Sequence, residues 1–70
     1  MNETIVYDNK VYTLYQQPHL DINTGKEQAV VADTDNKPHM AYFKDDKVVS
    51  IIPIKGFTTI DEVLNFFSIA

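Results

Sequence analysis

The sequence contains two histidines, His19 and His39, and because histidine is the commonest metal ligand they are the first candidates for metal ligation. A carboxylate from Asp21 or Asp33 would extend such a site, and the two-residue spacing of His19 and Asp21 would place both on one face of a strand. His19 follows Pro18, however, in a stretch whose composition is typical of a loop. We therefore interpret both histidines as surface or strand-end residues and predict no metal site.

A second metal motif fails on its spacing. The segment Asp33-Thr34-Asp35-Asn36 resembles the opening of a calcium-binding EF-hand loop, which places acidic or amide side chains at alternate positions. Such a loop also needs glycine at its sixth position and a bidentate glutamate at its twelfth. This sequence has Pro38 and Lys44 at those positions. The segment therefore predicts a β-turn.

Catalytic groups form no recognisable set in the sequence. The chain has no cysteine and two glycines, which excludes an activated thiol and a glycine-rich phosphate loop. Ser50 lies between apolar neighbours. The adjacent carboxylates Asp45-Asp46 and Asp61-Glu62 stand where a turn and a helix start are expected, so we expect neither pair to be desolvated. We predict that the protein is not an enzyme and needs no cofactor.

The charge balance excludes several kinds of partner. Ten acidic residues outnumber six basic ones, which gives a formal net charge of −4, and all six basic residues are lysines. Arginine supplies the commonest specific contact to bases and the best fork for phosphate, so the sequence predicts neither direct nucleic-acid binding nor affinity for anionic membranes. The apolar runs are too short to span a bilayer. The first residues do not resemble a signal peptide, and the lack of cysteine favours a cytoplasmic location.

The elements that would position these residues are short strands. A chain of 70 residues is expected to form a single domain, residues 1–70. This length is near the lower limit for folding without disulfides, a metal ion or a partner chain. Apolar segments separated by Asp/Asn/Lys clusters predict a meander, with a longer connection at Gln16–Glu27 that carries a turn at Asn23–Gly25. The expected strands are Thr4–Tyr7, Val11–Tyr15, Gln28–Asp33, His39–Phe43 and Val48–Ile52.

The last part of the chain changes to a helical period. Apolar residues recur at helical spacing and form one stripe, which consists of Ile60, Val63, Leu64 and Phe67. Thr59 and Glu62 have the spacing of a capping box. A helix of about nine residues is marginal alone, so we expect it to pack on the sheet. The predicted fold class is α+β, a small antiparallel β-meander of about five strands with one C-terminal α-helix packed on one face.

The two faces of the sheet follow from its register. Two-residue loops at Asp35-Asn36 and Asp45-Asp46 would place two sets of side chains on opposite faces. We expect the bulkier set to lie beneath the helix, namely Ala29, Val31, Met40, Tyr42, Val49 and Ile51. The other set is also largely apolar, and it comprises Val30, Ala32, His39, Ala41, Phe43, Val48, Ser50 and Ile52.

An apolar second face needs a cover, because the exposed face of a half-covered sheet is normally polar. Either the N-terminal hairpin or the Gln16–Glu27 segment covers it, or a second subunit or another protein does. A small-ligand groove is a third alternative. For the partner hypothesis we predict an interface of large apolar and aromatic side chains, which are Val30, Phe43, Val48, Ile52, Phe66, Tyr7 and Tyr15.

These patterns favour a small non-enzymatic protein–protein interaction or regulatory module that acts as a homodimer or as an inhibitor. Its composition is compatible with an accessory bacterial or phage protein. One alternative is an acidic decoy that occupies the nucleic-acid site of a host enzyme, which the net charge and small size suggest. Another is a small-ligand or metal-binding domain. The predicted partner is therefore another protein or a second copy of this chain.

Overall fold

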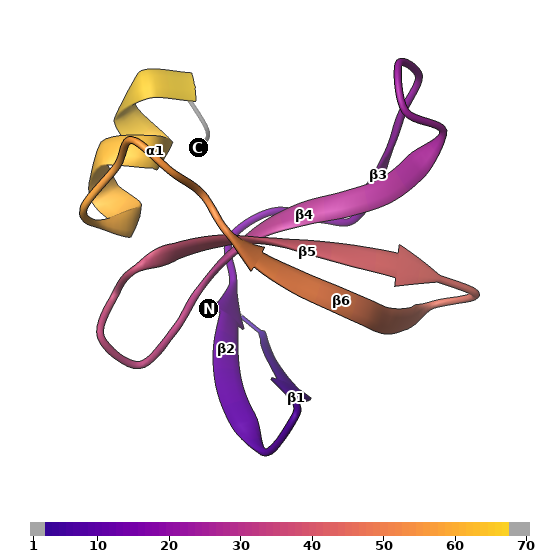
Figure 1. Cartoon of the computed structure of the whole chain (residues 1–70), viewed down its shortest axis with the longest axis horizontal. Helices are drawn as coiled ribbons and strands as arrows, with labels where there is room; N and C mark the ends of the chain where they lie inside the picture. The colour runs from indigo at the N-terminus through magenta and orange to yellow at the C-terminus, as the bar shows by residue number, and fades with distance from the viewer. Residues whose placement is uncertain (1–2, 68–70) are drawn as a thin grey trace.

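The computed structural model describes residues 3–67, which form an antiparallel sheet of six strands and one C-terminal helix (Figure 1). The sheet order is β1-β2-β4-β5-β6, and β3 pairs with β4 on the same edge as β2. The elements are β1 (Thr4–Tyr7), β2 (Lys10–Leu14), β3 (His19–Asp21), β4 (Lys26–Ala32), β5 (Pro38–Lys44), β6 (Lys47–Pro53) and α1 (Ile60–Phe67). The predicted α+β meander with one helix is confirmed, and β3 is an added strand inside the expected connection.

Two of the hairpin turns follow directly from their residue types. Asp8 and Asn9 connect β1 to β2, and Asp45 and Asp46 connect β5 to β6, all with positive φ between 53° and 65°. Asp and Asn tolerate this left-handed region better than most residues, and two such residues in sequence give the twist that a two-residue hairpin loop needs. The expected two-residue loop at Asp45-Asp46 is therefore confirmed.

The β4–β5 loop differs from the expectation and changes the register. It contains the five residues 33–37 and closes on the pair Ala32↔Pro38. The Asp33 carboxylate organises it by accepting the backbone N–H groups of Asp35 and Lys37, each at 2.9 Å. Because side chains alternate between faces, this one-residue shift moves the residues of β5 to the opposite face relative to β4.

A β-bulge shifts the register a second time, between β5 and β6. The pairing begins as expected at Phe43↔Val48, but Tyr42 then pairs with Ser50, so that Val49 is an extra residue on β6. Beyond the bulge Met40 lies opposite Ile52. The predicted sets of side chains on the two faces are therefore wrong, because a loop residue and a bulged residue each shift the alternation by one position.

Both faces nevertheless carry an apolar cluster, as the pattern indicated. On one face a cluster is covered by the β1–β2 hairpin, and it contains Tyr12, Leu14, Ala29, Val31 and Ala41. On the other face α1 packs over the sheet, and the cluster there contains Val30, Ala32, Ile60 and Val63. Figure 1 shows the N-terminal hairpin and the helix on opposite sides of β4 and β5. The N-terminal hairpin is thus the cover of the face that the helix leaves open.

The start of the helix is held by its cap and by the β4–β5 loop. The Glu62 carboxylate accepts the backbone N–H groups of Thr58 and Thr59 at 2.8 and 2.9 Å, which matches the predicted capping role of Glu62. These bonds lower the pKa of Glu62 because they favour its charged form. The backbone N–H of Ile60 also donates to the carbonyl of Asn36 at 2.7 Å. The helix spans eight residues, and the side chain of Phe67 lies outside what the structure describes.

Candidate interaction surface

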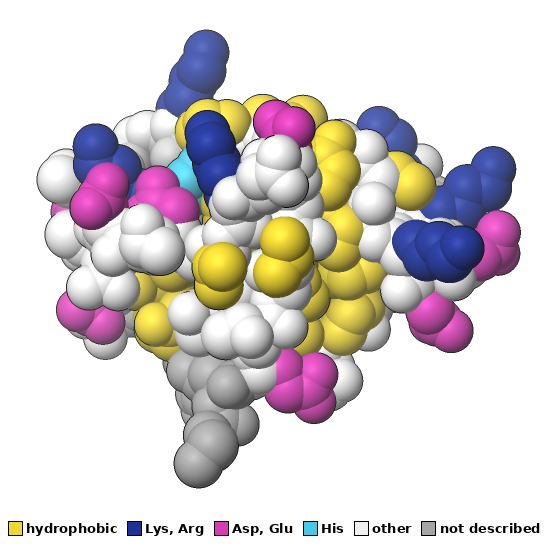
Figure 2. Space-filling model, turned by 90° about the horizontal axis from the view of Figure 1, so that it is seen from below, with side chains coloured by type: hydrophobic (Ala, Val, Ile, Leu, Met, Phe, Trp, Pro, Cys, Tyr) yellow, Lys and Arg dark blue, Asp and Glu magenta, His cyan; other side chains and the backbone are white. Residues whose placement is uncertain are grey.

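The most distinctive surface feature is the number of large apolar side chains that remain exposed. Among the described residues these are Val6, Val11, Leu20, Ile22, Val49, Ile52 and Phe66, with exposed fractions from 45% to 88%. Figure 2 shows one face of the molecule, on which hydrophobic side chains form a band between groups of charged side chains. Single exposed apolar residues are normal, but a concentration of them marks contact surfaces.

Four of the predicted interface residues lie on the helix side of the sheet. Val30 is 3% exposed and lies beneath α1, so it does not reach the surface of the folded chain. Tyr15 is half-buried against the same cluster. Ile52 and Phe66 are exposed, and the Phe66 ring stands edge-on to Phe57 at a centroid distance of 5.4 Å.

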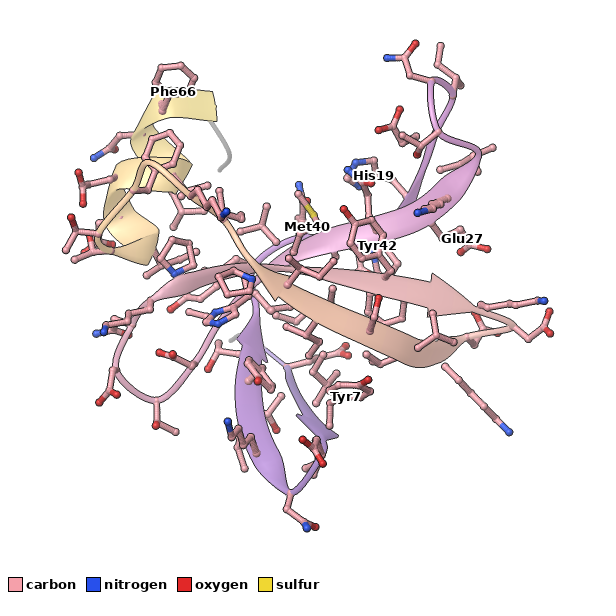
Figure 3. The ribbon with its side chains drawn as sticks, in the orientation of Figure 1. Tyr7, His19, Glu27, Met40, Tyr42 and Phe66 are labelled. Carbon is pink, nitrogen blue, oxygen red and sulfur yellow. The ribbon has the colours of Figure 1, made fainter. Side chains whose placement is uncertain are left out.

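The other three predicted residues lie on the hairpin side. Tyr7 and Phe43 are half-buried against the cluster that contains Tyr12 and Leu14. Val48 pairs with Phe43 across the β5–β6 hairpin. The Tyr7 hydroxyl donates to the carbonyl of Val49 at 3.2 Å, which joins the two ends of the curled sheet. Figure 3 shows Tyr7 and Met40 on opposite sides of the sheet. The structure therefore divides the seven predicted residues between two faces and does not bring them together.

The sequence interpretation missed a projecting hairpin, which we call the arm and define as residues 19–28. It consists of β3, the turn 22–25 and the first part of β4, and it extends away from both the helix and the β1–β2 hairpin (Figure 1). Leu20 in β3 is 59% exposed, and Ile22 in the turn is 88% exposed. The isoleucine in a turn otherwise composed of polar residues and glycine was the signal in the sequence, since turns favour polar residues and glycine.

The turn of the arm is ordered by its own hydrogen bonds. The backbone N–H of Gly25 donates to the Asp21 carbonyl at 2.7 Å, and that of Asn23 donates to the Asp21 carboxylate at 2.9 Å. The N–H of Lys26 donates to the Thr24 hydroxyl at 3.3 Å. Gly25 has φ of 73°, a left-handed conformation that glycine adopts without strain. The backbone of the turn is therefore ordered by local hydrogen bonds.

The base of the arm is fixed where the strand breaks after β2. The chain passes Pro18, which has no N–H to donate, and the side chain of Gln16 takes over one bond of the ladder. Its carbonyl oxygen accepts the backbone N–H of Val30 at 2.9 Å, while the N–H of Tyr15 donates to the Val30 carbonyl at 3.0 Å. The backbone N–H and carbonyl of the buried residue Val30 thus both have hydrogen-bond partners at the break.

A shallow depression of about 400 Å³ lies beside the arm, between it and the β5–β6 hairpin. Its apolar lining comes from Leu20, Phe43 and Val49, and its charged lining is balanced, with two lysines and two carboxylates: Lys26, Lys44, Glu27 and Asp45. The ammonium group of Lys26 lies 5.2 Å from the centre of the Tyr42 ring, a cation–π geometry. We call this feature the arm-base depression.

The two histidines are engaged locally. Nδ1 of His19 lies 3.3 Å from the carbonyl oxygen of Gln17, and Nδ1 of His39 lies 3.0 Å from that of Lys37. Within residues 3–67 no group of three His, Asp or Glu side chains is placed to hold a metal ion, and no charged side chain is buried. In the same part of the chain, no helix has the length and apolar character needed to cross a membrane.

Comparison with known proteins identifies no family to which the chain can be matched, no curated protein with significant sequence similarity and no solved structure with significant similarity.

Proposed function

We propose that this protein is a small, non-enzymatic interaction module that acts by binding another protein chain. The observation that carries the proposal is the pre-organised arm, which presents Ile22 with 88% of its surface exposed. A turn whose backbone is ordered before binding loses little backbone entropy in a complex, so burial of the side chain that it carries contributes more to affinity. The hydrogen bonds within the turn supply this order.

The distribution of polar groups supports binding in preference to catalysis. An acid, base or nucleophile is usually activated by desolvation or by a neighbouring charge. Apart from Pro38, the buried side chains of residues 3–67 belong to the two apolar clusters, and the Glu62 carboxylate, whose pKa is lowered, is engaged as a helix cap. Apolar contact is therefore the chemistry that the described surface offers most clearly.

Site-specific photo-cross-linking in the cell of origin tests the proposal. A benzophenone amino acid replaces Ile22 in one variant and the exposed polar residue Asn65 in a control variant. We expect discrete cross-linked products from position 22 that excess unlabelled protein suppresses, and few or none from position 65. Equal labelling at both positions, or labelling that competition does not reduce, would contradict the proposal.

The same cross-linking assay distinguishes an apolar contact from an acidic decoy. Apolar contacts persist as salt rises, whereas attraction between a protein of net charge −4 and a basic nucleic-acid site is screened. We expect cross-linking from position 22 to persist at high salt. Its loss there would favour the decoy hypothesis instead.

A further inference from the structure

We propose that the N-terminal hairpin is a gate over the outer edge of β6, the edge that faces away from β5, and that it prevents other strands from pairing there. Tyr7 closes one end of this edge, and Pro53 blocks the other end. The gate lies on β1 and β6 and does not involve the arm.

β6 is the longest strand with a free edge in the described sheet. β1 and β6 stand at the two ends of the strand order, and β3 leaves a further free edge because it pairs with β4 alone. β1 and β3 contain four and three residues, whereas β6 contains seven. Short edge strands offer few groups to an incoming strand, so β6 is the edge at which unwanted pairing would be most extensive.

The sequence of β6 adds to this hazard. Residues 48–52 carry no charge, and four of these five residues are valine or isoleucine, which favour strands. Uncharged segments of this length and strand propensity associate readily when an edge exposes them. A chain that carries such a segment at an edge therefore needs a means to block it.

The backbone hydrogen bonds show which groups of β6 face outward. The N–H of Ile54 donates to the carbonyl of Pro38 at 3.1 Å, so the backbone groups at residue 54 face β5. Backbone groups alternate in direction along an antiparallel strand, so those of Ile51 and Pro53 face the outer edge. Because proline has no N–H, position 53 offers an incoming strand a carbonyl but no donor.

The other end of the outer edge is covered by β1. The carbonyl of the bulged residue Val49 accepts the Tyr7 hydroxyl at 3.2 Å, which engages the acceptor that an incoming N–H would use (Figure 3). Tyr7, Ile5 and Ile51 pack together against the buried cluster beneath the N-terminal hairpin. Within residues 3–67 no backbone hydrogen bond joins β1 to β6. Side chains alone therefore hold β1 against this edge.

The two blocked positions leave Ile51 between them. An incoming antiparallel strand bonds to alternate residues, which here are 49, 51 and 53. Of these three, Ile51 keeps both its N–H and its carbonyl for pairing. When the N-terminal hairpin opens, the Val49 carbonyl is released and the edge is uncovered, so that β6 of two copies can pair about Ile51. The closed gate keeps the two copies apart.

Sedimentation equilibrium on the purified full chain tests the gate, over concentrations from low micromolar to near millimolar. Tyr7→Phe keeps the packed ring and removes the hydroxyl bond, so it should raise the self-association constant by about 2- to 5-fold. Pro53→Val supplies a donor on the outer edge and should raise this constant by about 10-fold. Tyr42→Phe is the matched control, since it removes a hydroxyl from the ring that Lys26 contacts, and it should leave the constant unchanged.

Two further measurements on the double variant Tyr7→Phe, Pro53→Val locate the contact. Hydrogen exchange at the Ile51 amide should become slower on association, because pairing gives this outward N–H an acceptor. Addition of Ile52→Lys should reverse the association, because a charge in an edge strand opposes pairing, and Ile52 is already 52% exposed. Amide spectra at low protein concentration show that each variant remains folded.

The gate is overturned if neither Tyr7→Phe nor Pro53→Val increases self-association. Association of the double variant that leaves exchange at Ile51 unchanged, or that persists with Ile52→Lys, overturns it as well, and so does a wild-type chain that is already paired through Ile51. None of these results affects cross-linking from position 22, which tests the proposed interaction function separately.

Discussion

β2 of the N-terminal hairpin and β3 of the arm pair with the same edge of β4, yet the first hairpin is folded against the sheet and the arm projects from it. In β2, Tyr12 and Leu14 are 7% and 8% exposed. In the arm, Leu20 and Ile22 are 59% and 88% exposed. Two neighbouring hairpins therefore differ in position, one contributing to the core and the other lying at the surface.

The difference arises from the part of β4 that each hairpin contacts. β2 pairs with Val31 and Ala32, where the sheet curls until β1 contacts β6 and Tyr7 bonds to Val49. Within the arm, β3 pairs with residues 26–28 at the other end of β4, beyond the curl. Both the curvature of the sheet and the larger apolar content of β1 and β2 therefore favour burial of the N-terminal hairpin.

The largest expected effect comes from truncating the same residue type in both hairpins. Leu14→Ala removes a buried side chain and should lower the free energy of unfolding by about 2–4 kcal/mol. Leu20→Ala removes an exposed one and should change that free energy by less than about 0.5 kcal/mol in the monomer. Urea denaturation at low protein concentration, followed by circular dichroism, measures the free energy of unfolding of both variants. Similar losses for the two variants would show that the arm is as well packed as β2.

The next effect concerns the strand break that separates the two hairpins. Gln16→Ala should leave the buried N–H of Val30 without its acceptor and lower the free energy of unfolding by about 1–2 kcal/mol. The neighbouring Gln17→Ala is the control, since Gln17 is exposed, and it should have little effect. Hydrogen exchange at the Val30 amide should become faster in the first variant alone. Unchanged exchange there would mean that the arm is held in place without this side chain.

A smaller effect should follow from opening the curl. Tyr7→Phe keeps the packed ring but removes the bond to the Val49 carbonyl, so it should lower the free energy of unfolding by about 0.5–1 kcal/mol. Tyr42→Phe, on the other face of the sheet, is the matched control and keeps the ring that Lys26 contacts. Chemical denaturation compares the two, and NMR contacts between β1 and β6 should weaken only in Tyr7→Phe. A larger loss of unfolding free energy in Tyr42→Phe than in Tyr7→Phe would contradict this prediction.

The smallest effect on stability concerns the helix cap. The cap belongs to neither hairpin and therefore provides a reference for the effects of the hairpin variants. The N–H donors of Thr58 and Thr59 lower the pKa of Glu62 in the folded state below its ordinary value of 4.5. Its contribution to stability is therefore fully present above that ordinary value and is lost as pH falls through the lowered pKa. Carbon NMR titration of the carboxyl measures the shift directly. Glu62→Gln should reduce the loss of stability in this acidic range, and an identical pH profile for both proteins would contradict the assignment.

The local elements were predictable because their signals are local. The helix start at Ile60 follows from the Thr59 and Glu62 cap, and the turn at Asp45-Asp46 follows from the tolerance of Asp for positive φ. The β3 strand was not predicted, because three residues after Pro18 carry too little pattern to distinguish a strand from a loop. The Gln16 side chain that bonds to Val30 just before β3 joins residues 14 positions apart, a contact that no local pattern indicates.

The sequence by itself determined that both faces of the sheet are apolar, that a helix closes the chain and that the described fold is α+β. Only the tertiary structure decided which residues occupy each face, since one loop residue and the bulge at Val49 each reversed the alternation. It also decided which of the predicted interface residues are available at the surface, burying Val30 beneath the helix and exposing Ile22 at the apex of the arm. The physical reason is that side-chain alternation has a period of two, so a single inserted residue moves every later side chain to the opposite face.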